Sequence, residues 1–179
     1  ALMGFLSGCA PVKPVAMFPA KAEVEYVRQL SAPLLQVLRR EQPDRWWDCP
    51  LPQVTLDTLS IQAYAVIWTP GKVDGKICPR WGLEISLGAF IELSVEEFRA
   101  MLAHELAHFA LDHLDRSAHK ESKREREREA TEEAARLLWA IDAPCAALGT
   151  LFIKMDSRLW ADIAWDACLK VSRSLPVRR

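Results

Sequence analysis

The sequence has no apolar run long enough to cross a membrane, no internal repeat and no low-complexity tract. It also lacks an excess of either charge, because 23 Lys and Arg residues face 24 Asp and Glu residues, for a formal net charge of -1. Without an excess of positive charge, the chain has no electrostatic basis for binding nucleic acid. Glutamates also interrupt the basic run at residues 120–128 and would repel phosphate. Hydrophobic residues, by contrast, are plentiful: they make up half of the 179 residues, which is enough for one domain with a sizeable core.

The most informative motif is HELAH at positions 104–108, which matches the pattern HExxH. It lies in residues 94–114, whose apolar periodicity and opening S-x-x-E capping box predict one amphipathic helix. Side chains four residues apart share a helix face, so His104 and His108 can bind one metal ion together. Glu105 then lies beside the ion and can take a proton from a bound water. The alternative is that these residues fell at this spacing by chance on an ordinary core helix.

A catalytic zinc ion needs a third protein ligand, and the Arg/Glu-rich residues 120–133 offer several carboxylates. A helix through this stretch places Glu127 on a small and apolar face with Ala130 and Ala134, whereas the face of Glu129 continues through charged residues. We therefore predict Glu127 as the third ligand; the alternative is an ion pair between Glu127 and Lys123. The remaining glutamates are predicted to face solvent and to pair with basic neighbours: Glu121, Glu125, Glu129, Glu132 and Glu133.

Three segments resemble a known family: HELAHFALDH, EREATEEAARLL and WAIDAPCAALGTLFIKM. They look like the HtpX-like and BepA-like gluzincin metallopeptidases, which include the CAAX prenyl endopeptidases, and the resemblance covers roughly residues 61–155. It implies one Zn²⁺ per chain bound by His104, His108 and Glu127, with Glu105 as the general base. It also implies a helix-dominated α+β fold, a minimal gluzincin domain with a small β-sheet beside the HExxH helix. His113 matches a further histidine of the family pattern and is expected to contact a ligand rather than the metal.

The chain departs from the family pattern in three places. Thr131 stands where the family has an aspartate that supports the metal ligands, so that hydrogen bond is expected to be weakened or replaced. Gln62 stands where the family has an asparagine. The downstream His-Pro and arginine signature is missing, which leaves Arg158 or a backbone N–H to stabilise the oxyanion. The ImmA-like proteases, which carry asparagine at the Thr131 position, are the alternative resemblance.

The N-terminus resembles the end of a bacterial lipoprotein signal. Leu6-Ser7-Gly8-Cys9 looks like a lipobox in which Cys9 is lipidated, and a proline-rich stretch follows. We expect residues 1–9 to be residual signal, 10–22 a tether and 23–179 a single metallopeptidase domain. Ala10 after the cysteine resembles outer-membrane sorting, so we expect a lipid-anchored periplasmic protein of the outer membrane. The alternative is an apolar N-terminus with an incidental cysteine.

Cysteine spacing agrees with an exported protein. Setting Cys9 aside leaves four cysteines, and we predict the pairs Cys49–Cys78 and Cys145–Cys168, because disulfides form in oxidising compartments. The alternative is four buried free thiols that pack as small hydrophobic residues.

Other elements follow from pattern and turn signals. Residues 23–40 predict a helix bent or split at Pro33, and residues 54–69 predict strands followed by turns at Pro70-Gly71 and Asp74-Gly75. A short strand is predicted at residues 84–87, ending at Gly88, and two further helices at about residues 144–154 and 157–172. In the family that the chain resembles, the strand before the HExxH helix flanks the cleft, where a substrate could add by edge pairing.

These features lead to two hypotheses. The first is a zinc-dependent endopeptidase of the bacterial envelope, acting on protein or peptide substrates there and held to the membrane by its lipid anchor. The second is a scaffold or chaperone-like lipoprotein of an envelope assembly, with weak or no catalysis. Thr131 and the missing downstream signature motivate the second hypothesis. The intact Glu105 favours the first, because a purely structural metal site has no use for that carboxylate.

Overall fold

The computed structural model describes residues 16–17, 20–43, 53–56, 59–73, 76–113 and 122–174. Within them the chain is helix-dominated and has one small sheet, which confirms the α+β class. The elements are β1 (Ala16–Met17), α1 (Lys21–Glu41), β2 (Gln53–Leu56), β3 (Ala63–Val73), β4 (Lys76–Ser86), α2 (Leu87–Glu92), α3 (Val95–Ala110), α4 (Lys123–Ala140), α5 (Ala146–Lys154) and α6 (Arg158–Ser174). None of the helices in the described ranges combines the length and apolar character needed to span a bilayer.

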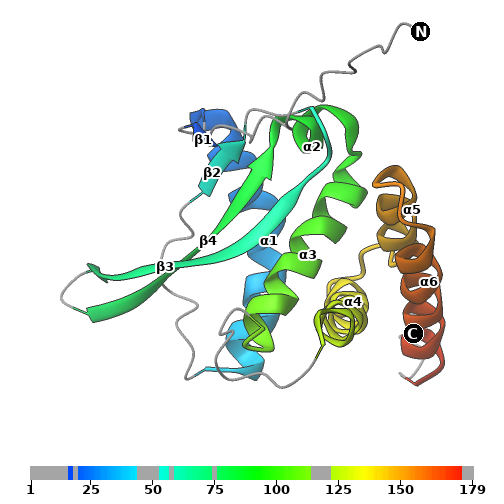
Figure 1. Cartoon of the computed structure of the whole chain (residues 1–179). Coiled ribbons are helices and arrows are strands. Elements are labelled where there is room, and N and C mark those ends of the chain that lie inside the picture. The colour runs from blue at the N-terminus through cyan, green and yellow to red at the C-terminus, as the bar shows by residue number, and fades with distance from the viewer. Residues whose placement is uncertain are drawn as a thin grey trace, which may run out of the picture.

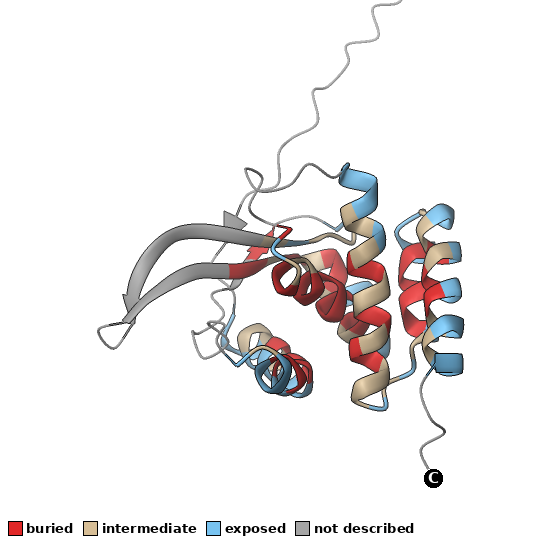
Figure 2. Ribbon diagram, turned by 90° about the horizontal axis from the view of Figure 1, so that it is seen from below, coloured by how far each residue is buried: buried red, intermediate tan, exposed pale blue. Residues whose placement is uncertain are grey.

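Helix α3 lies at the centre of the molecule, between the sheet on one side and α4, α5 and α6 on the other (Figure 1). It begins after Ser94, whose hydroxyl accepts from the Glu97 N–H while the Glu97 carboxylate accepts from the Ser94 N–H, so the predicted capping box is confirmed. Leu102 and Leu106 are fully buried in its middle. Buried residues gather on the inward sides of the helices, and exposed residues lie on their outer sides (Figure 2). The HExxH motif is therefore held in a helix whose middle is buried in the core.

Helix α1 continues through Pro33, so of the two predicted effects of this proline, a bend or a split, the split does not occur. Pro33 is exposed, whereas Leu30, Leu34 and Leu38 are buried on the inward face. A proline inside a helix costs about 3 kcal/mol, but burying each leucine contributes about 1.5–3 kcal/mol. Packing of the continuous apolar face therefore outweighs the backbone penalty.

The sheet has the strand order β1-β2-β4-β3, which makes β3 an edge strand next to α3. Strands β3 and β4 are antiparallel, and their register is irregular between Trp68 and Gly71. The predicted turn at Pro70-Gly71 is wrong, because both residues lie inside β3. A proline has no N–H for the ladder, and edge strands with local irregularities tolerate it. The other predicted turn residues, Asp74 and Gly75, lie outside the described residues.

The strand before the motif helix is longer than predicted and ends earlier than Gly88. Strand β4 runs from Lys76 to Ser86, and the Ser86 hydroxyl accepts from the Ala89 N–H to begin α2, a short helix that the sequence did not indicate. Gly88 belongs to this helix. A Cβ at Gly88 would overlap the main-chain carbonyl of Leu59, so only glycine allows this close approach.

An ion pair joins α3 to α5. Lys154 Nζ lies 2.7 Å from Glu97 Oε2 and also donates to the Glu92 carbonyl at 2.8 Å. Burial raises the pKa of Glu97, but hydrogen bonds from Lys154 and Ser94 outweigh burial and hold it below its ordinary value. Folding thus favours the ionised Glu97.

We therefore expect this contact to stabilise the fold above about pH 4.5 and to fade as pH falls through the lower pKa of Glu97 in the folded state. Lys154→Gln should lower the free energy of unfolding at pH 7 by about 1 kcal/mol, since Lys154 is partly exposed. The difference from wild type should shrink towards pH 3. Urea unfolding at pH 7, 5 and 3 measures it, with Lys170→Gln on the outer face of α6 as the control. An equal difference at all three pH values would contradict this assignment.

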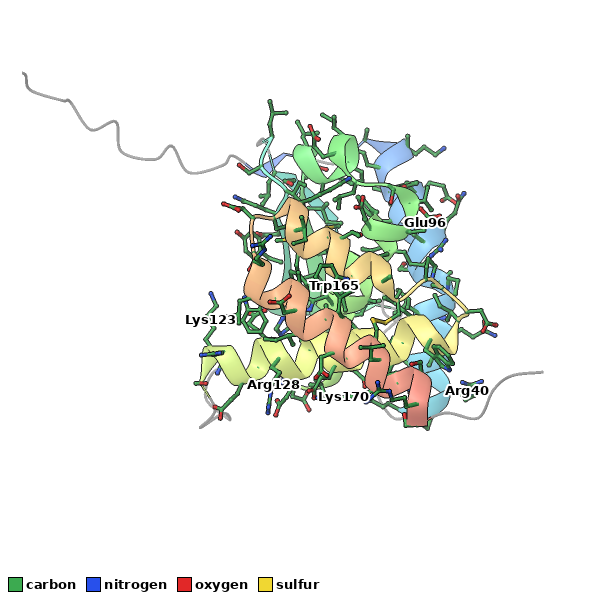
Figure 3. The ribbon with its side chains drawn as sticks, turned by 90° about the vertical axis from the view of Figure 1, so that its right-hand side faces the viewer. Arg40, Glu96, Lys123, Arg128, Trp165 and Lys170 are labelled. Carbon is green, nitrogen blue, oxygen red and sulfur yellow. A yellow bond between two sulfur atoms is a disulfide. The ribbon has the colours of Figure 1, made fainter. Side chains whose placement is uncertain are left out.

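The predicted Cys145–Cys168 disulfide is present and joins the start of α5 to α6, with a Cα–Cα distance of 5.8 Å. The same helices meet closely at Gly149, where a Cβ would overlap the indole of Trp165 (Figure 3). Cys9 and Cys49 lie outside the described residues, as does the side chain of Cys78, so the predicted Cys49–Cys78 pair stays a prediction.

Breaking this disulfide should destabilise the domain without unfolding the metal site. The cysteines are separated by 23 positions, and the chain-entropy model gives about 3 kcal/mol for closing a loop of that size. We expect Cys168→Ser, compared under oxidising conditions with wild type, to lose about that free energy of unfolding. Reducing agent should lower wild type by a similar amount and leave Cys168→Ser unchanged. A variant as stable as oxidised wild type would show that the bridge does not constrain the fold.

Candidate metal centre

Two helices bring the three predicted ligands to one point. His104 and His108 come from α3, and Glu127 comes from α4, which packs beside it. His104 Nε2 lies 3.2 Å from His108 Nε2 and 3.2 Å from Glu127 Oε2, and His108 Nε2 lies 3.4 Å from the same oxygen. Ligand atoms about 2.0–2.1 Å from a tetrahedral zinc ion stand about 3.3–3.4 Å apart. The three atoms therefore fit three corners of such a tetrahedron.

The donor set is also suitable for a metal that must remain open to a substrate. Two imidazoles and one carboxylate leave a fourth position free, which distinguishes catalytic zinc sites from closed structural ones. Burial raises the pKa of Glu127, but hydrogen bonds from His104 and His108 outweigh it and hold the pKa well below its usual range. Glu127 is thus ionised, as a ligand must be.

The helical phase of α4 explains why Glu127, and not its neighbours, reaches this point. Ser122 and Glu125 form a capping box that begins the helix, and Ala130 and Thr131 on the inward face are fully buried. Glu127 is the last charged residue on that face before the core. It contacts the two histidines, and the alternative ion pair with Lys123 is not formed.

Glu105 lies on the face of α3 that points towards β3. Its Oε2 accepts a hydrogen bond from the Ala65 N–H of that strand at 2.7 Å. Burial raises the pKa of Glu105, against the lowering effects of His104, His108 and the Ala65 N–H. A carboxyl with a raised pKa in a fixed position beside a metal site is suited to accept a proton and return it.

His113 and Glu129 extend the site behind His108. Asp112 adopts a left-handed conformation (φ 60) after the end of α3, and His113 N then donates to the His108 carbonyl at 2.9 Å, which folds the chain back. His113 Nδ1 lies 3.2 Å from His108 Nδ1, and His113 Nε2 lies 3.2 Å from Glu129 Oε2. A metal on His108 Nε2 leaves the proton on Nδ1, so each group in the chain His108–His113–Glu129 donates to the next.

Sequence reasoning placed His113 in contact with a ligand, and the structure does so. The expectation that Glu129 only faces solvent is wrong, although its side chain is 41% exposed. The missing signal was tertiary: the turn at Asp112 brings His113 across to α4.

We expect Glu129→Ala to keep one zinc per chain at saturating zinc but to lower zinc affinity about tenfold or more, because His113 loses its acceptor and orients His108 less well. Glu132→Ala, on the same helix and outside this chain of contacts, is the matched control. Competition titration with a chromophoric chelator measures both affinities. If both variants bind zinc as tightly as wild type, Glu129 has no part in the site.

Thr131 stands where the family that the sequence resembles has an aspartate, and its hydrogen bond is made within its own helix. The Thr131 hydroxyl donates to the Glu127 main-chain carbonyl at 2.8 Å. His104 Nδ1 is buried, and within the described residues no hydrogen-bond partner reaches it. His104 is instead positioned by packing, with Phe152 edge-on at a ring-centroid distance of 5.5 Å.

A cleft of about 1170 Å³ opens over the ligands. Its walls are Ala63–Ala65 of β3, the motif residues of α3, the first turn of α4, and the facing ends of α5 and α6. Arg158, one of the two predicted oxyanion donors, is exposed and is not among the residues that line this cleft. Gln62 lies just before β3, and its N–H donates to the Ser86 hydroxyl at 2.9 Å, away from the ligands.

Comparison with known proteins does not assign the chain to a family: no protein-family model matches it, and no curated protein is similar to it. The interpretation of the site therefore rests on its own geometry.

Proposed function

We propose that the chain is a zinc-dependent endopeptidase in which His104, His108 and Glu127 hold the metal and Glu105 is the general base. The observation that carries this proposal is the arrangement of the three ligand atoms, 3.2–3.4 Å apart, beside a buried carboxylate at the floor of an open cleft. A structural site would use four protein ligands and would not need Glu105. This geometry supports the gluzincin-like zinc site that the sequence predicts.

The residues of the chain divide the reaction between them. Bound zinc would polarise the scissile carbonyl and lower the pKa of a water to about 7. Glu105 would accept the proton of the attacking water, and the Ala65 N–H fixes the carboxylate that receives it. The raised pKa of Glu105 favours taking up that proton, which Glu105 would then pass to the leaving amine. His113 and Glu129 would orient His108 throughout.

Strand β3 offers a place for the substrate backbone. Ser86 N donates to Gln62 O at the start of the pairing with β4, and hydrogen bonding alternates along an antiparallel pair. Ala63 and Ala65 therefore turn their N–H and C=O groups to the open edge, where Ala65 N–H meets Glu105. An extended peptide could pair with this edge at Ala63 and cross the metal centre.

One observation favours the second candidate function, a catalytically weak scaffold or chaperone-like protein. No partner for His104 Nδ1 is found in the part of the chain that the structure describes, so one candidate ligand lacks the hydrogen bond that usually orients a zinc-binding histidine. Such a site could bind metal and turn over slowly. Cleavage of casein by the zinc-loaded chain, with an inactive Glu105→Gln variant, separates the two functions.

We further propose that the protein acts in the bacterial periplasm, anchored by lipid on Cys9, with envelope proteins as substrates or assembly partners. The Cys145–Cys168 disulfide supports an oxidising compartment. Fractionation of cells that produce wild type and Cys9→Ser tests the anchor: wild type should follow the membrane and the variant should move to the soluble periplasm. Identical distribution of the two would make Cys9 an ordinary cysteine.

A further inference from the structure

The lining of the cleft over the metal centre includes two chemically different groups of side chains. Cationic side chains come from the N-terminal part of α4, and apolar side chains come from α5 and α6. Building on the proposed endopeptidase function, we propose that the cleft selects peptides that carry both a carboxylate and a large apolar side chain close to the scissile bond.

Lys123 and Arg124 belong to the cationic group. Lys123 precedes Glu127 by four residues and shares its helix face, so the two backbone positions lie about 6 Å apart along the helix axis. An extended peptide covers about 3.3 Å per residue. The carboxylate that Lys123 and Arg124 could bind would therefore belong to a residue about two positions from the scissile bond. Figure 3 shows Lys123 at the N-terminal end of α4.

Among the described residues, the lining of the cleft holds no acidic side chain that is free to pair with Lys123 or Arg124. The acidic residues of its lining are Glu105 and Glu127, and both are engaged at the metal centre. Neither Lys123 nor Arg124 has a side-chain ion pair within the residues that the structure describes. Glu125 lies close by, but it is exposed, accepts from the Ser122 N–H and is outside the lining. The positive end of the α4 dipole adds to this field, so an anion is the complementary ligand.

The side chains that α5 and α6 contribute to the lining are largely apolar and partly open to water. Met155 and Leu159 line the cleft although they are 39% and 50% exposed. They continue outward from the buried Leu151 and Phe152, the latter packed against the ligand His104. Apolar side chains left in water inside a cleft gain from contact with an apolar side chain of a ligand.

The test measures binding separately from hydrolysis. Zinc-loaded Glu105→Gln is titrated with labelled eight-residue peptides, blocked at both ends, that carry Phe at the centre and either Glu or Gln two positions away on each side in turn. We expect a Glu peptide to bind about three- to tenfold more tightly than its Gln counterpart at low salt, with the preference reduced at high salt. A further peptide with Gln and a free C-terminal carboxylate shows whether a chain end serves as well as a side chain.

The double variant Lys123→Gln/Arg124→Gln should lose the preference, and Leu159→Gln should weaken all Phe-containing peptides. Arg128→Gln is the matched control, because Arg128 is exposed on α4 beside Lys170 and outside the cleft (Figure 3). Equal affinity for Glu and Gln peptides, an equal effect of Arg128→Gln, or no peptide binding overturns the inference. Casein cleavage without a charge preference would overturn it and leave the peptidase standing. A charge preference without casein cleavage would support the inference about the cleft and contradict the peptidase function.

Discussion

Glu105→Gln is expected to abolish peptide hydrolysis while the chain still binds one zinc ion. The substitution keeps the shape of the side chain and an oxygen that can accept from the Ala65 N–H, but removes the group that takes the proton. Because Glu105 is not one of the three residues that offer a ligand atom, zinc affinity should change little. General-base catalysis contributes about a hundredfold to ten-thousandfold, so the rate of casein cleavage should fall by at least that range.

The matched control is Glu96→Gln, a substitution of the same kind on the first turn of the same helix, where the side chain is exposed (Figure 3). It should cleave casein at the wild-type rate. Metal analysis and circular dichroism of all three proteins show whether zinc content and fold are retained. If Glu105→Gln cleaves as fast as wild type, the proposed mechanism is wrong. If wild type with one bound zinc does not cleave casein at all, that result supports the scaffold function instead.

The grouping of the three candidate ligands could be predicted from the sequence because both helices are regular. The spacing of His104 and His108 and the helical phase of Glu127 depend only on the period of a helix, and the structure brings the three together. The capping boxes at Ser94 and Ser122 set where those helices begin. Local chemistry thus determined which side chains meet at the candidate metal site.

The rest of the site depends on contacts between distant segments. The hydrogen bond from Ala65 to Glu105 and the one between His113 and Glu129 each join elements whose relative position no local pattern contains. The sheet was misjudged for a related reason: Pro70-Gly71 has the composition of a turn, but pairing of β3 with β4 continues past it. Helix α2 is only six residues long, too short for its apolar period to be recognised.

His108→Ala is expected to remove stoichiometric zinc and the stability that zinc provides. The site has three protein ligands, so losing one leaves His104 and Glu127 and also frees His113 from its contact with the site. At zinc a thousandfold above the dissociation constant, wild type should gain about 4 kcal/mol from binding, because the ion stabilises only the folded chain. For a domain of this size that corresponds to a rise in Tm of about 10 °C, and in His108→Ala the rise should nearly vanish.

Glu127→Gln tests the third ligand in the same way, and Glu132→Gln is its control on the same helix. The low pKa of Glu127 means that its carboxylate is charged at neutral pH, and an amide supplies neither that charge nor an equally strong donor to zinc. We expect Glu127→Gln to resemble His108→Ala in zinc content and in the lost rise of Tm, while Glu132→Gln resembles wild type. Wild-type zinc binding by Glu127→Gln would show that another group completes the site. Equal losses in Glu127→Gln and Glu132→Gln would show that charge on α4, rather than a specific carboxylate, holds the metal.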